Sequence, residues 1–248
     1  MRAVLMAAGR GMRLREASGQ LAKALVPVQG KTLAEHQLNT LRSAGFTDDQ
    51  IVVVGGCDYD LLEPIVRRVC PGATLLNNPR FTDQNLLSLL TARDYLHDGF
   101  LVVNVDHLMP HAIHRKILAV DANQPVVACV DNDRPIGDDD MKVQLKDDGV
   151  HIQAISKQLT TFDRGYIGMT RCTAAAIPQY LQTADQVLEE VGAPKAVVEM
   201  ILARLATTNM APSIYDASGH KWFEIDTPEE LTIAENGLQE MPEFFEQC

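Results

Sequence analysis

The sequence predicts an α/β protein whose strands form a doubly wound, mostly parallel sheet. Two observations carry this prediction. Short apolar segments rich in β-branched residues alternate with amphipathic segments at the spacing of strand–helix–strand units. Several apolar segments end in glycine or in polar side chains, and sheets of this class bind ligands at the carboxyl ends of their strands. The length of 248 residues suits one large domain spanning residues 1–248.

The first half of the chain supplies the parallel strands and their crossover helices. The β-branched run 51–54 is typical of a buried parallel strand. Leu33, Leu38 and Leu41 have the spacing of a helix that Gly45 ends. In order, we expect a strand within residues 3–8, helix 32–44, strand 51–54, helix 58–69, strand 73–76, helix 84–95 and strand 100–105.

The second half departs from this alternation. Asp148-Gly149 lies between two short alternating runs, which predicts a β-hairpin excursion from the sheet. Thr227, Pro228 and Glu230 have the capping-box pattern of a helix start. In order, we expect strand 126–130, an exposed acidic loop 131–140, hairpin strands 141–145 and 151–155, strand 166–170, helices 173–182 and 194–206, strand 213–215 and a final helix after residue 227.

The loop after the first strand has the composition of a phosphate cradle. Small residues and two glycines let backbone amides approach an anion closely, and Gly55 brings another flexible turn to the same sheet edge. Arg10, Arg13 and Lys23 add cations where a polyphosphate needs its charge neutralised. The residues of these two turns that we expect to contact a nucleotide are Ala7, Ala8, Gly9, Arg10, Gly11, Met12 and Gly55.

Two other interpretations of the glycines fail on spacing. A dinucleotide-binding loop, G-x-G-x-x-G, opens a helix at once, whereas Leu14 replaces the third glycine here and no helical pattern begins before about Lys31. The ATPase loop G-x-x-x-x-G-K-[ST] does not occur in the sequence. What remains is a long basic loop between a strand and a helix.

Two aspartates follow apolar runs at positions suited to a hard cation. Asp106 comes directly after the expected strand 100–105, and Asp226 directly after the run 222–225. Mg2+ prefers carboxylate oxygens that a rigid sheet holds in place. Helix capping explains the residues after Asp226 but not Asp226 itself. We therefore expect Asp106 and Asp226 to bind Mg2+ across the phosphates of a nucleotide.

Two segments carry a family resemblance. Residues 6–14 read M-A-A-G-R-G-M-R-L, and residues 22–25 read A-K-A-L. They resemble the L-A-A-G-x-G-x-R-L and P-K-A-L signatures of the sugar-phosphate nucleotidyltransferase superfamily, and the departures at Met6 and Ala22 remove no charge. Three further segments resemble the branch of inositol-1-phosphate, phosphocholine and phosphonate cytidylyltransferases: residues 105–109, 155–159 and 222–231.

This resemblance implies a fold and a set of roles. The fold is a single Rossmann-like α/β domain of the nucleotide-diphospho-sugar transferase type, with a mixed, mostly parallel sheet and a small β-hairpin excursion. Asp106 and Asp226 would bind Mg2+, and Lys157 would contact the phosphate of the acceptor. In an in-line attack on the α-phosphorus, Arg13 would bind the leaving pyrophosphate and Lys23 would bridge the α-phosphate and the acceptor. Arg13, Lys23 and Lys157 are therefore the expected catalytic residues.

The expected acceptor site departs from the inositol relatives. Where they have an aspartate near a D-x-G segment, residues 164–168 read R-G-Y-I-G, so a polyol-binding carboxylate is expected to be missing. Tyr166 and Gly168 resemble the phosphocholine and phosphonate relatives and, with Lys157, form the expected acceptor site. Tyr166 and Trp222 could form an aromatic wall for a quaternary ammonium group or could pack in the core.

Together these residues predict an Mg2+-dependent nucleotidyltransferase that uses CTP and a small phosphorylated or phosphonate acceptor. Asn85 lies in a segment that resembles the region reading base and ribose, although it could equally cap a helix. One alternative is a sugar-1-phosphate nucleotidyltransferase using UTP, dTTP or GTP. Another is a catalytically silent nucleotide-sensing regulatory subunit, against which the presence of every expected metal and phosphate ligand argues.

Composition narrows the partners and the compartment. The excess of 33 acidic over 22 basic residues argues against binding of polymeric nucleic acid. The five cysteines are widely spaced and lack a C-x-x-C pair, which favours reduced thiols and a cytoplasmic protein. No apolar run is long enough to span a bilayer, and Met1-Arg2 leads straight into the first strand without a leader pattern. The oligomeric state stays open, and a homo-oligomer is one of the options.

Overall fold

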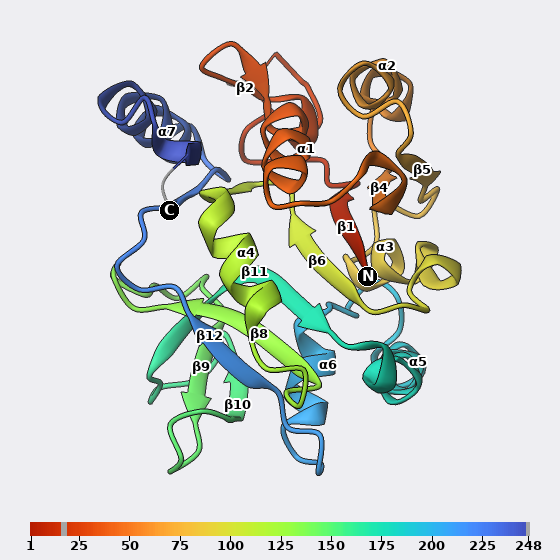
Figure 1. Ribbon diagram of the computed structural model, residues 1–248, viewed down its shortest axis with the longest axis vertical. Helices are drawn as coiled ribbons and strands as arrows, with labels where there is room; N and C mark the ends of the chain where they lie inside the picture. The colour runs from red at the N-terminus through yellow and green to blue at the C-terminus, as the bar shows by residue number, and fades with distance from the viewer. Residues whose placement is uncertain (16–18, 247–248) are drawn as a thin grey trace.

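A mixed central sheet forms the framework of the protein. The structure is a computed structural model that describes residues 1–15 and 19–246 (Figure 1). Four parallel strands make up one part of the sheet in the spatial order β6-β1-β4-β5. Their bounds are β1 (Arg2–Ala7), β4 (Ile51–Gly55), β5 (Thr74–Asn77) and β6 (Phe100–Asn104). This part supplies the strand ends at which the first loop, Gly55 and Asp106 were expected to meet.

The remainder of the sheet is largely antiparallel and is attached through β11, which pairs with β6, β8 and β9. β9 and β10 form the expected hairpin, with Gly149 at a φ of +67° in its turn. β12 extends the sheet in parallel beside β8. The bounds are β8 (Val126–Asp131), β9 (Lys142–Leu145), β10 (Ile152–Ser156), β11 (Arg164–Cys172) and β12 (Ser213–Asp216).

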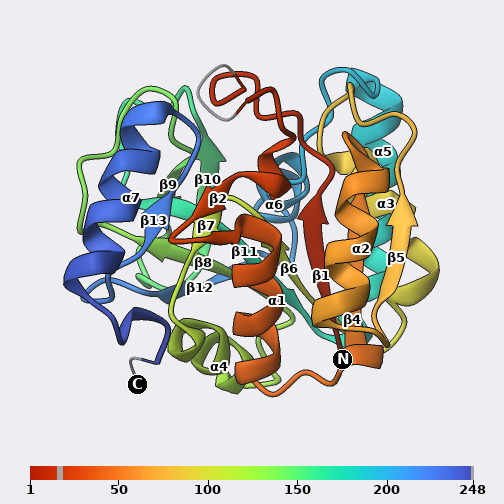
Figure 2. The ribbon, with the colours of Figure 1, turned by 90° about the horizontal axis from the view of Figure 1, so that it is seen from above.

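Helices cover both faces of the sheet, which confirms the doubly wound α/β prediction (Figures 1 and 2). Successive strand residues point to opposite faces, so Leu5 belongs to one apolar core and Val4 to the other. The first core receives buried residues from α1 (Leu33–Ser43), α2 (Tyr59–Val69), α4 (His111–Ala119) and α7 (Pro228–Glu240). The second receives them from α3 (Leu86–Thr91), α5 (Ile177–Val191) and α6 (Glu199–Leu205).

Several expected boundaries were wrong. The expected helix 84–95 is a short α3 followed by a 3-10 turn at Arg93–Tyr95. The expected helix 173–182 begins later and runs further, because Pro178 lies in the first turn of α5 and Gly192, with a φ of +75°, ends it. The expected helix 194–206 is reduced to the seven residues of α6.

Two small two-stranded sheets were not anticipated. β2 (Pro27–Val28) pairs with β3 (Lys31–Thr32), and β7 (His107–Leu108) pairs with β13 (Phe223–Glu224). Strands of two residues are too short to show an alternating pattern, so they could not be predicted from the sequence. The second pair matters for function because it joins the segments that carry Asp106 and Asp226.

Two expectations about the rest of the chain can be compared with the structure. Cys57, Cys70, Cys129 and Cys172 are buried free thiols, and Cys248 lies outside the described residues. Among residues 1–15 and 19–246, no helix combines the length and the apolar character needed to cross a membrane.

His114 on α4 makes stability depend on pH. Its side chain is fully buried, and burial lowers its pKa to about 4. In the unfolded chain a histidine takes up its proton near pH 6.5, so the stability due to neutral His114 is complete above that pH. We expect about 3 kcal/mol of unfolding free energy to be lost as the pH falls from about 6.5 to 4.

Urea unfolding of the wild type and of His114→Leu at several pH values tests this. The variant should lack this part of the pH dependence, whereas replacement of the exposed His97 by Gln should keep it. If the unfolding free energy of His114→Leu depended on pH as steeply as that of the wild type, other groups would cause the acid sensitivity.

Candidate active site

The loop after β1 closes on Lys23. Gly11 has a φ of +63°, and a Cβ at this position would lie 3.0 Å from the Cβ of Lys23. The Lys23 amide donates to the carbonyl of Gly9 at 3.3 Å, and the amide of Leu14 donates to the carbonyl of Gly11 at 2.9 Å. Glycine at position 11 is therefore required both by the backbone conformation and by the close approach of Lys23.

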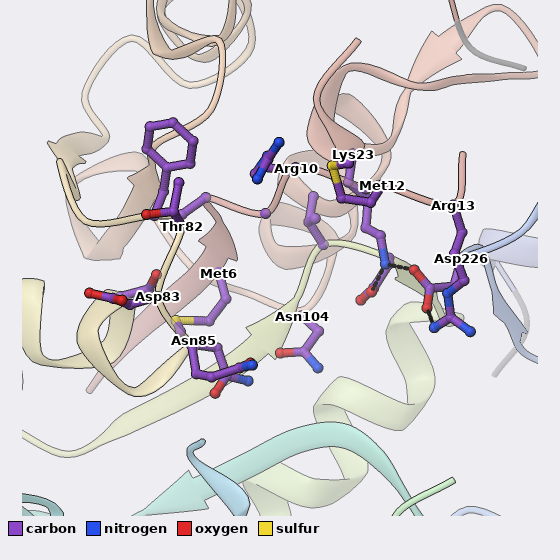
Figure 3. A pocket seen from close by; sticks show the side chains of 18 residues that line it. Met6, Arg10, Met12, Arg13, Lys23, Thr82, Asp83, Asn85, Asn104 and Asp226 are labelled. Carbon is purple, nitrogen blue, oxygen red and sulfur yellow. Dashed lines mark hydrogen bonds and ion pairs between the residues drawn. The ribbon is translucent and has the colours of Figure 1, made fainter. Parts of the chain in front are cut away.

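Lys23 joins the two expected metal ligands. Its Nζ lies 2.7 Å from Oδ2 of Asp106 and also forms an ion pair with Asp226. Arg13 forms a second ion pair with Asp226 (Figure 3). The side chains of Lys23, Asp106 and Asp226 are only 12–18% exposed. Segments far apart in the chain thus converge where the glycine loop meets the carboxyl end of β6.

The pairing of β7 with β13 explains this convergence. Glu224 lies opposite His107 in this pair, and the amide of Ile225 donates to the carbonyl of Asp106 at 2.9 Å. The next residue, Asp226, is thereby held beside Asp106. Thr227 then caps α7, since its side chain accepts from the amide of Glu230 at 3.2 Å. Thr227 and Glu230 form the expected capping box, and the neighbouring Asp226 remains available as the expected metal ligand.

Charge pairing outweighs burial within this cluster. Burial would raise the pKa of Asp106, but Lys23 and His107 hold it well below its usual range. Burial would likewise lower the pKa of Lys23, but Asp106 and Asp226 raise it above its ordinary value. The Nδ1 of His107 lies 2.8 Å from Oδ1 of Asp106, and this contact raises the pKa of His107 against the effect of its burial. The carboxylate of Asp106 therefore stays ionised and available to a cation.

The donor set fits Mg2+. Mg2+ is typically bound through one or two carboxylates, with substrate phosphates and water completing its coordination. Asp106 and Asp226 already share one cation, the ammonium of Lys23. Within the described ranges no group of three or more His, Cys, Asp or Glu side chains could hold a metal by itself. The two carboxylates thus match a site that is completed by the phosphates of a nucleotide.

A cavity of about 370 Å³ opens beside this cluster. We call it the nucleotide cavity, because it is lined by most of the residues expected to bind the nucleotide: Ala8, Gly9, Arg10, Gly11, Met12 and Asn85. Arg13, Lys23, Asp106 and Asp226 line it too. Ala7 is instead buried inside β1. Gly55 packs against Tyr59 and Leu62 of α2, where a Cβ would lie 2.9 Å and 3.0 Å from their side chains. Ala7 and Gly55 are therefore not among the residues that line this cavity, because both lie within the strands and not in the turns after them.

Asn85 connects the nucleotide cavity to α6. It occupies the position before α3 but makes no side-chain capping bond to that helix. Its Oδ1 accepts from the amide of Val198 at 2.9 Å, directly before α6. Asn85 therefore ties down the start of another helix while it lines the cavity, which leaves a role in nucleotide binding open.

A second, smaller cavity of about 140 Å³ is also lined by Asp106, and we call it the acceptor cavity. All three residues expected to bind the acceptor line it: Lys157, Tyr166 and Gly168. It also shares Asn104 and Asp106 with the nucleotide cavity. The two cavities therefore meet at the carboxyl end of β6, as transfer of a group between two bound substrates requires.

Gly168 allows β11 to pass close to Asn104 and to His107, which contacts Asp106. Its φ is +70°, and a Cβ there would lie 2.8 Å from Nδ2 of Asn104 and 3.0 Å from the ring of His107. We expect Gly168→Ala to cost about 1–3 kcal/mol of stability and to displace His107 from Asp106, with an activity loss of more than about 10-fold. Gly149→Ala is the matched control, because its φ of +67° is similar and its Cβ would meet open space. Equal effects on activity at both positions would contradict this account.

The contacts of Trp222 fit the core-packing alternative, whereas Tyr166 lines the acceptor cavity. Trp222 stacks on His107 with ring centroids 5.4 Å apart, and the guanidinium of Arg134 lies 4.8 Å from its centroid. Its Nε1 donates to Asp131 at 2.6 Å. The hydroxyl of Tyr166 lies 2.9 Å from that of Thr170. Trp222 packs as a core residue, and these two rings do not form a cage.

Six charged residues that were not among the expected site residues also line the acceptor cavity: His107, Arg134, Asp139, Asp140, Glu199 and Glu224. Arg134 lies 2.7 Å from Asp140 and 3.1 Å from Glu224. Asp139 belongs to the acidic segment that was expected to be a solvated loop. Two signals were available in the sequence: the acidic run 138–140 could pair with a cationic acceptor, and Glu224 lies two residues before Asp226. The contacts of the other residues depend on the tertiary fold.

Asp139 holds two expected phosphate-binding cations. Its carboxylate accepts from Lys157 at 2.9 Å and from Arg13 at 2.8 Å, and these contacts lower its pKa. The three side chains are 46–67% exposed, and such pairs contribute at most about 1 kcal/mol. We expect Asp139→Asn to lower the KM values of both substrates by about 2- to 5-fold, because Arg13 and Lys157 become free for phosphate oxygens. The adjacent exposed Asp138→Asn is the control, and a higher KM in Asp139→Asn would show that Asp139 contacts substrate.

Known proteins share this sequence and fold. A bifunctional IPC transferase and DIPP synthase from Rubrobacter xylanophilus is 28% identical over 233 residues, covering 94% of this chain and 51% of that protein. The chain therefore spans about half the length of this relative. The inositol-1-phosphate CTP transferase of T. maritima superposes with a TM-score of 0.78 at 21% identity, over 94% of this chain and 93% of the other. The CTP:phosphocholine cytidylyltransferase of Streptococcus pneumoniae gives 0.78 at 19%, over 96% and 98%.

These likenesses confirm the expected fold of the nucleotide-diphospho-sugar transferase type and the resemblance to cytidylyltransferases. The model of the MobA-like NTP transferase domain matches residues 3–221, which include the glycine loop, Lys23, Asp106 and every lining residue of the acceptor cavity except Glu224. The chain belongs to the family of MobA-like NTP transferase domains.

Proposed function

We propose that this protein transfers CMP from CTP to a phosphate or phosphonate oxygen of a small acceptor in an Mg2+-dependent reaction. The single observation that carries the proposal is the convergence of Lys23, Asp106 and Asp226 in the cavity beside the glycine loop, with Asp106 also lining the second cavity, which Lys157 lines. Cytidine is favoured because the names of the similar proteins include a CTP transferase and a CTP-dependent cytidylyltransferase.

The reaction would be an in-line displacement without a covalent enzyme intermediate. An acceptor oxygen forms a bond to the α-phosphorus, the bond from that phosphorus to the bridging oxygen breaks, and pyrophosphate leaves. Mg2+ bound to Asp106 and Asp226 would neutralise charge on the triphosphate. The protein itself mainly positions the two substrates and stabilises the charge that develops.

Each cation has a role that follows from its position. Lys23 lines the nucleotide cavity and contacts Asp106, which lines both cavities, so its ammonium could contact the α-phosphate and the attacking oxygen together. Arg13, at the mouth of the nucleotide cavity, can bind the departing pyrophosphate. Lys157 lines the acceptor cavity and can hold the acceptor's phosphate once its exposed contact with Asp139 opens. These contacts would lower the barrier by orientation and by charge neutralisation.

Pyrophosphate release tests the proposal. The purified protein is incubated with Mg2+ and each of CTP, UTP, GTP and dTTP, against inositol 1-phosphate, phosphocholine, aminoalkyl phosphonates and glucose 1-phosphate. We expect release with CTP and a small non-sugar acceptor, and none when EDTA removes Mg2+. A preference for another nucleotide with a sugar 1-phosphate would replace this proposal by the sugar-nucleotide alternative. Nucleotide binding without turnover of any acceptor would instead support a silent regulatory subunit.

A further inference from the structure

Glu199 is one of the carboxylates that line the acceptor cavity. A neighbouring cavity of about 470 Å³ shares three lining residues with the acceptor cavity: Met141, Lys157 and Glu199. Glu199 begins α6, which contributes to the second core of the sheet, so it projects from a packed element. The cation expected to bind the acceptor's phosphate and the Glu199 carboxylate therefore border the same space.

Glu199 differs from the other carboxylates of this cavity in its pairing. Asp106 is paired with Lys23 and His107, and Asp139 with Arg13 and Lys157. Asp140 and Glu224 share the guanidinium of Arg134. Glu199 forms no ion pair with any residue in the part of the chain that the structure describes. It is the carboxylate of the cavity that still lacks a cationic partner.

The environment of Glu199 compensates its charge incompletely. Burial raises its pKa, and this effect exceeds the opposing effects of its own backbone amide, the charges of Lys157 and His107, and the side chain of Asn85. An ionised carboxylate in such a place gains from a cation that enters the cavity. A ligand with a positively charged group would supply the cationic partner that Glu199 lacks.

We infer that the acceptor carries a primary ammonium group a few atoms from its phosphate or phosphonate, and that Glu199 binds this ammonium while Lys157 binds the anionic end. The inference rests on the proposed function and deepens it by naming the class of acceptor. Glu199 would then determine specificity and position the acceptor for attack. It would take no part in the bond changes themselves.

The cavity suits this group better than the two other acceptor types. A quaternary ammonium group cannot donate a hydrogen bond and is bound by aromatic cages. Among the described residues that line the two cavities, Tyr166 is the only Phe, Tyr or Trp. A polyol ring needs hydrogen-bonding groups around its edge, but Arg134 engages Asp140 and Glu224.

A purely structural role for Glu199 makes a different prediction. A carboxylate in the first turn of a helix stabilises it through the helix dipole. If this were its whole purpose, removing the charge would lower the melting temperature without changing the choice of acceptor. The ratio of catalytic efficiencies for two matched acceptors therefore separates the two roles.

The test compares 2-aminoethylphosphonate with propylphosphonate, in which a methyl group replaces the ammonium. With CTP and Mg2+, we expect wild-type kcat/KM to favour the amine by about 10- to 100-fold, the range of a hydrogen bond to a buried charged group. Glu199→Gln should reduce this ratio to below about 5-fold while kcat/KM for propylphosphonate stays within about 2-fold. The exposed Glu189→Gln on α5 carries the same charge change and should keep the wild-type ratio. Phosphoethanolamine and propyl phosphate make the same comparison for a phosphate acceptor.

Three outcomes would overturn the inference. They are equal use of the amine and its methyl analogue, preference for phosphocholine or inositol 1-phosphate over both amines, and an equal loss for both acceptors in a folded Glu199→Gln. Each of these leaves the proposed transfer of CMP intact, because CTP is still consumed. Absence of pyrophosphate release from CTP with every acceptor would instead reject the proposed function, and the inference with it.

Discussion

Lys23→Ala is expected to lower turnover by about 10³-fold while the protein stays folded. Lys23 lies between Asp106 and Asp226 in the nucleotide cavity, and Asp106 also lines the acceptor cavity, so the ammonium of Lys23 would stabilise charge beside the proposed point of attack. Removing one preorganised charge-stabilising group from an active site typically costs about 10²–10³-fold in kcat. Steady-state kinetics with CTP and the best acceptor measure the loss, and circular dichroism checks the fold.

Lys31→Ala is the matched control for this substitution. Lys31 is an exposed lysine of β3, eight residues along the chain, and lies outside both cavities. Its removal should change kcat by less than about 2-fold. Lys23→Ala should also lose up to about 3 kcal/mol of stability without Mg2+, since two partly buried carboxylates lose a shared cation. Near-normal turnover of Lys23→Ala would remove the catalytic role assigned to it.

Asp106→Asn is expected to have an effect of the same size by another route. Asparagine keeps the shape of the side chain but loses the charge that Lys23, His107 and a divalent cation share. We expect kcat to fall by about 10²–10³-fold and the Mg2+ concentration for half-maximal activity to rise, because only one metal-binding carboxylate remains. A titration of rate against Mg2+ at saturating CTP measures both effects.

Asp98→Asn provides the comparison for Asp106→Asn. Asp98 is 64% exposed and precedes β6 at the opposite end of the strand from Asp106. Its replacement should leave the Mg2+ titration unchanged. If Asp106→Asn lowered kcat but kept the wild-type Mg2+ dependence, Asp106 would act through Lys23 and His107 and not through the metal.

The parallel half of the fold was predictable because its signals are local. The β-branched run before Gly55 and the apolar strand before Asp106 define buried strands without reference to the rest of the chain. The boundaries of α5 and α6 were less predictable, since several consecutive residues suit a helix and the turn between them depends on packing. The pairing of β7 with β13 could not be predicted from the sequence, because it joins two-residue strands that lie more than 100 positions apart in the chain.

The site shows the same division. The glycine loop, Lys23 and the two aspartates could be selected because a motif or a strand end marked each of them. Gly55 was expected to lie in the turn after its strand, but β4 includes Gly55. Its Cα packs against the side chains of α2. Glu199 and Arg134 gave no signal, because their relevance comes from cavities that form when distant loops and helices pack around β11.

The central claim is that Asp106 and Asp226 together bind one divalent cation over the phosphates of the nucleotide. Anomalous scattering from a crystal of the protein with Mn2+ and CTP tests it most directly. We predict one metal peak bonded to both carboxylates at about 2.1–2.2 Å, with Lys23 moved onto a phosphate oxygen. A metal bound to the triphosphate but more than about 5 Å from either aspartate would contradict the claim.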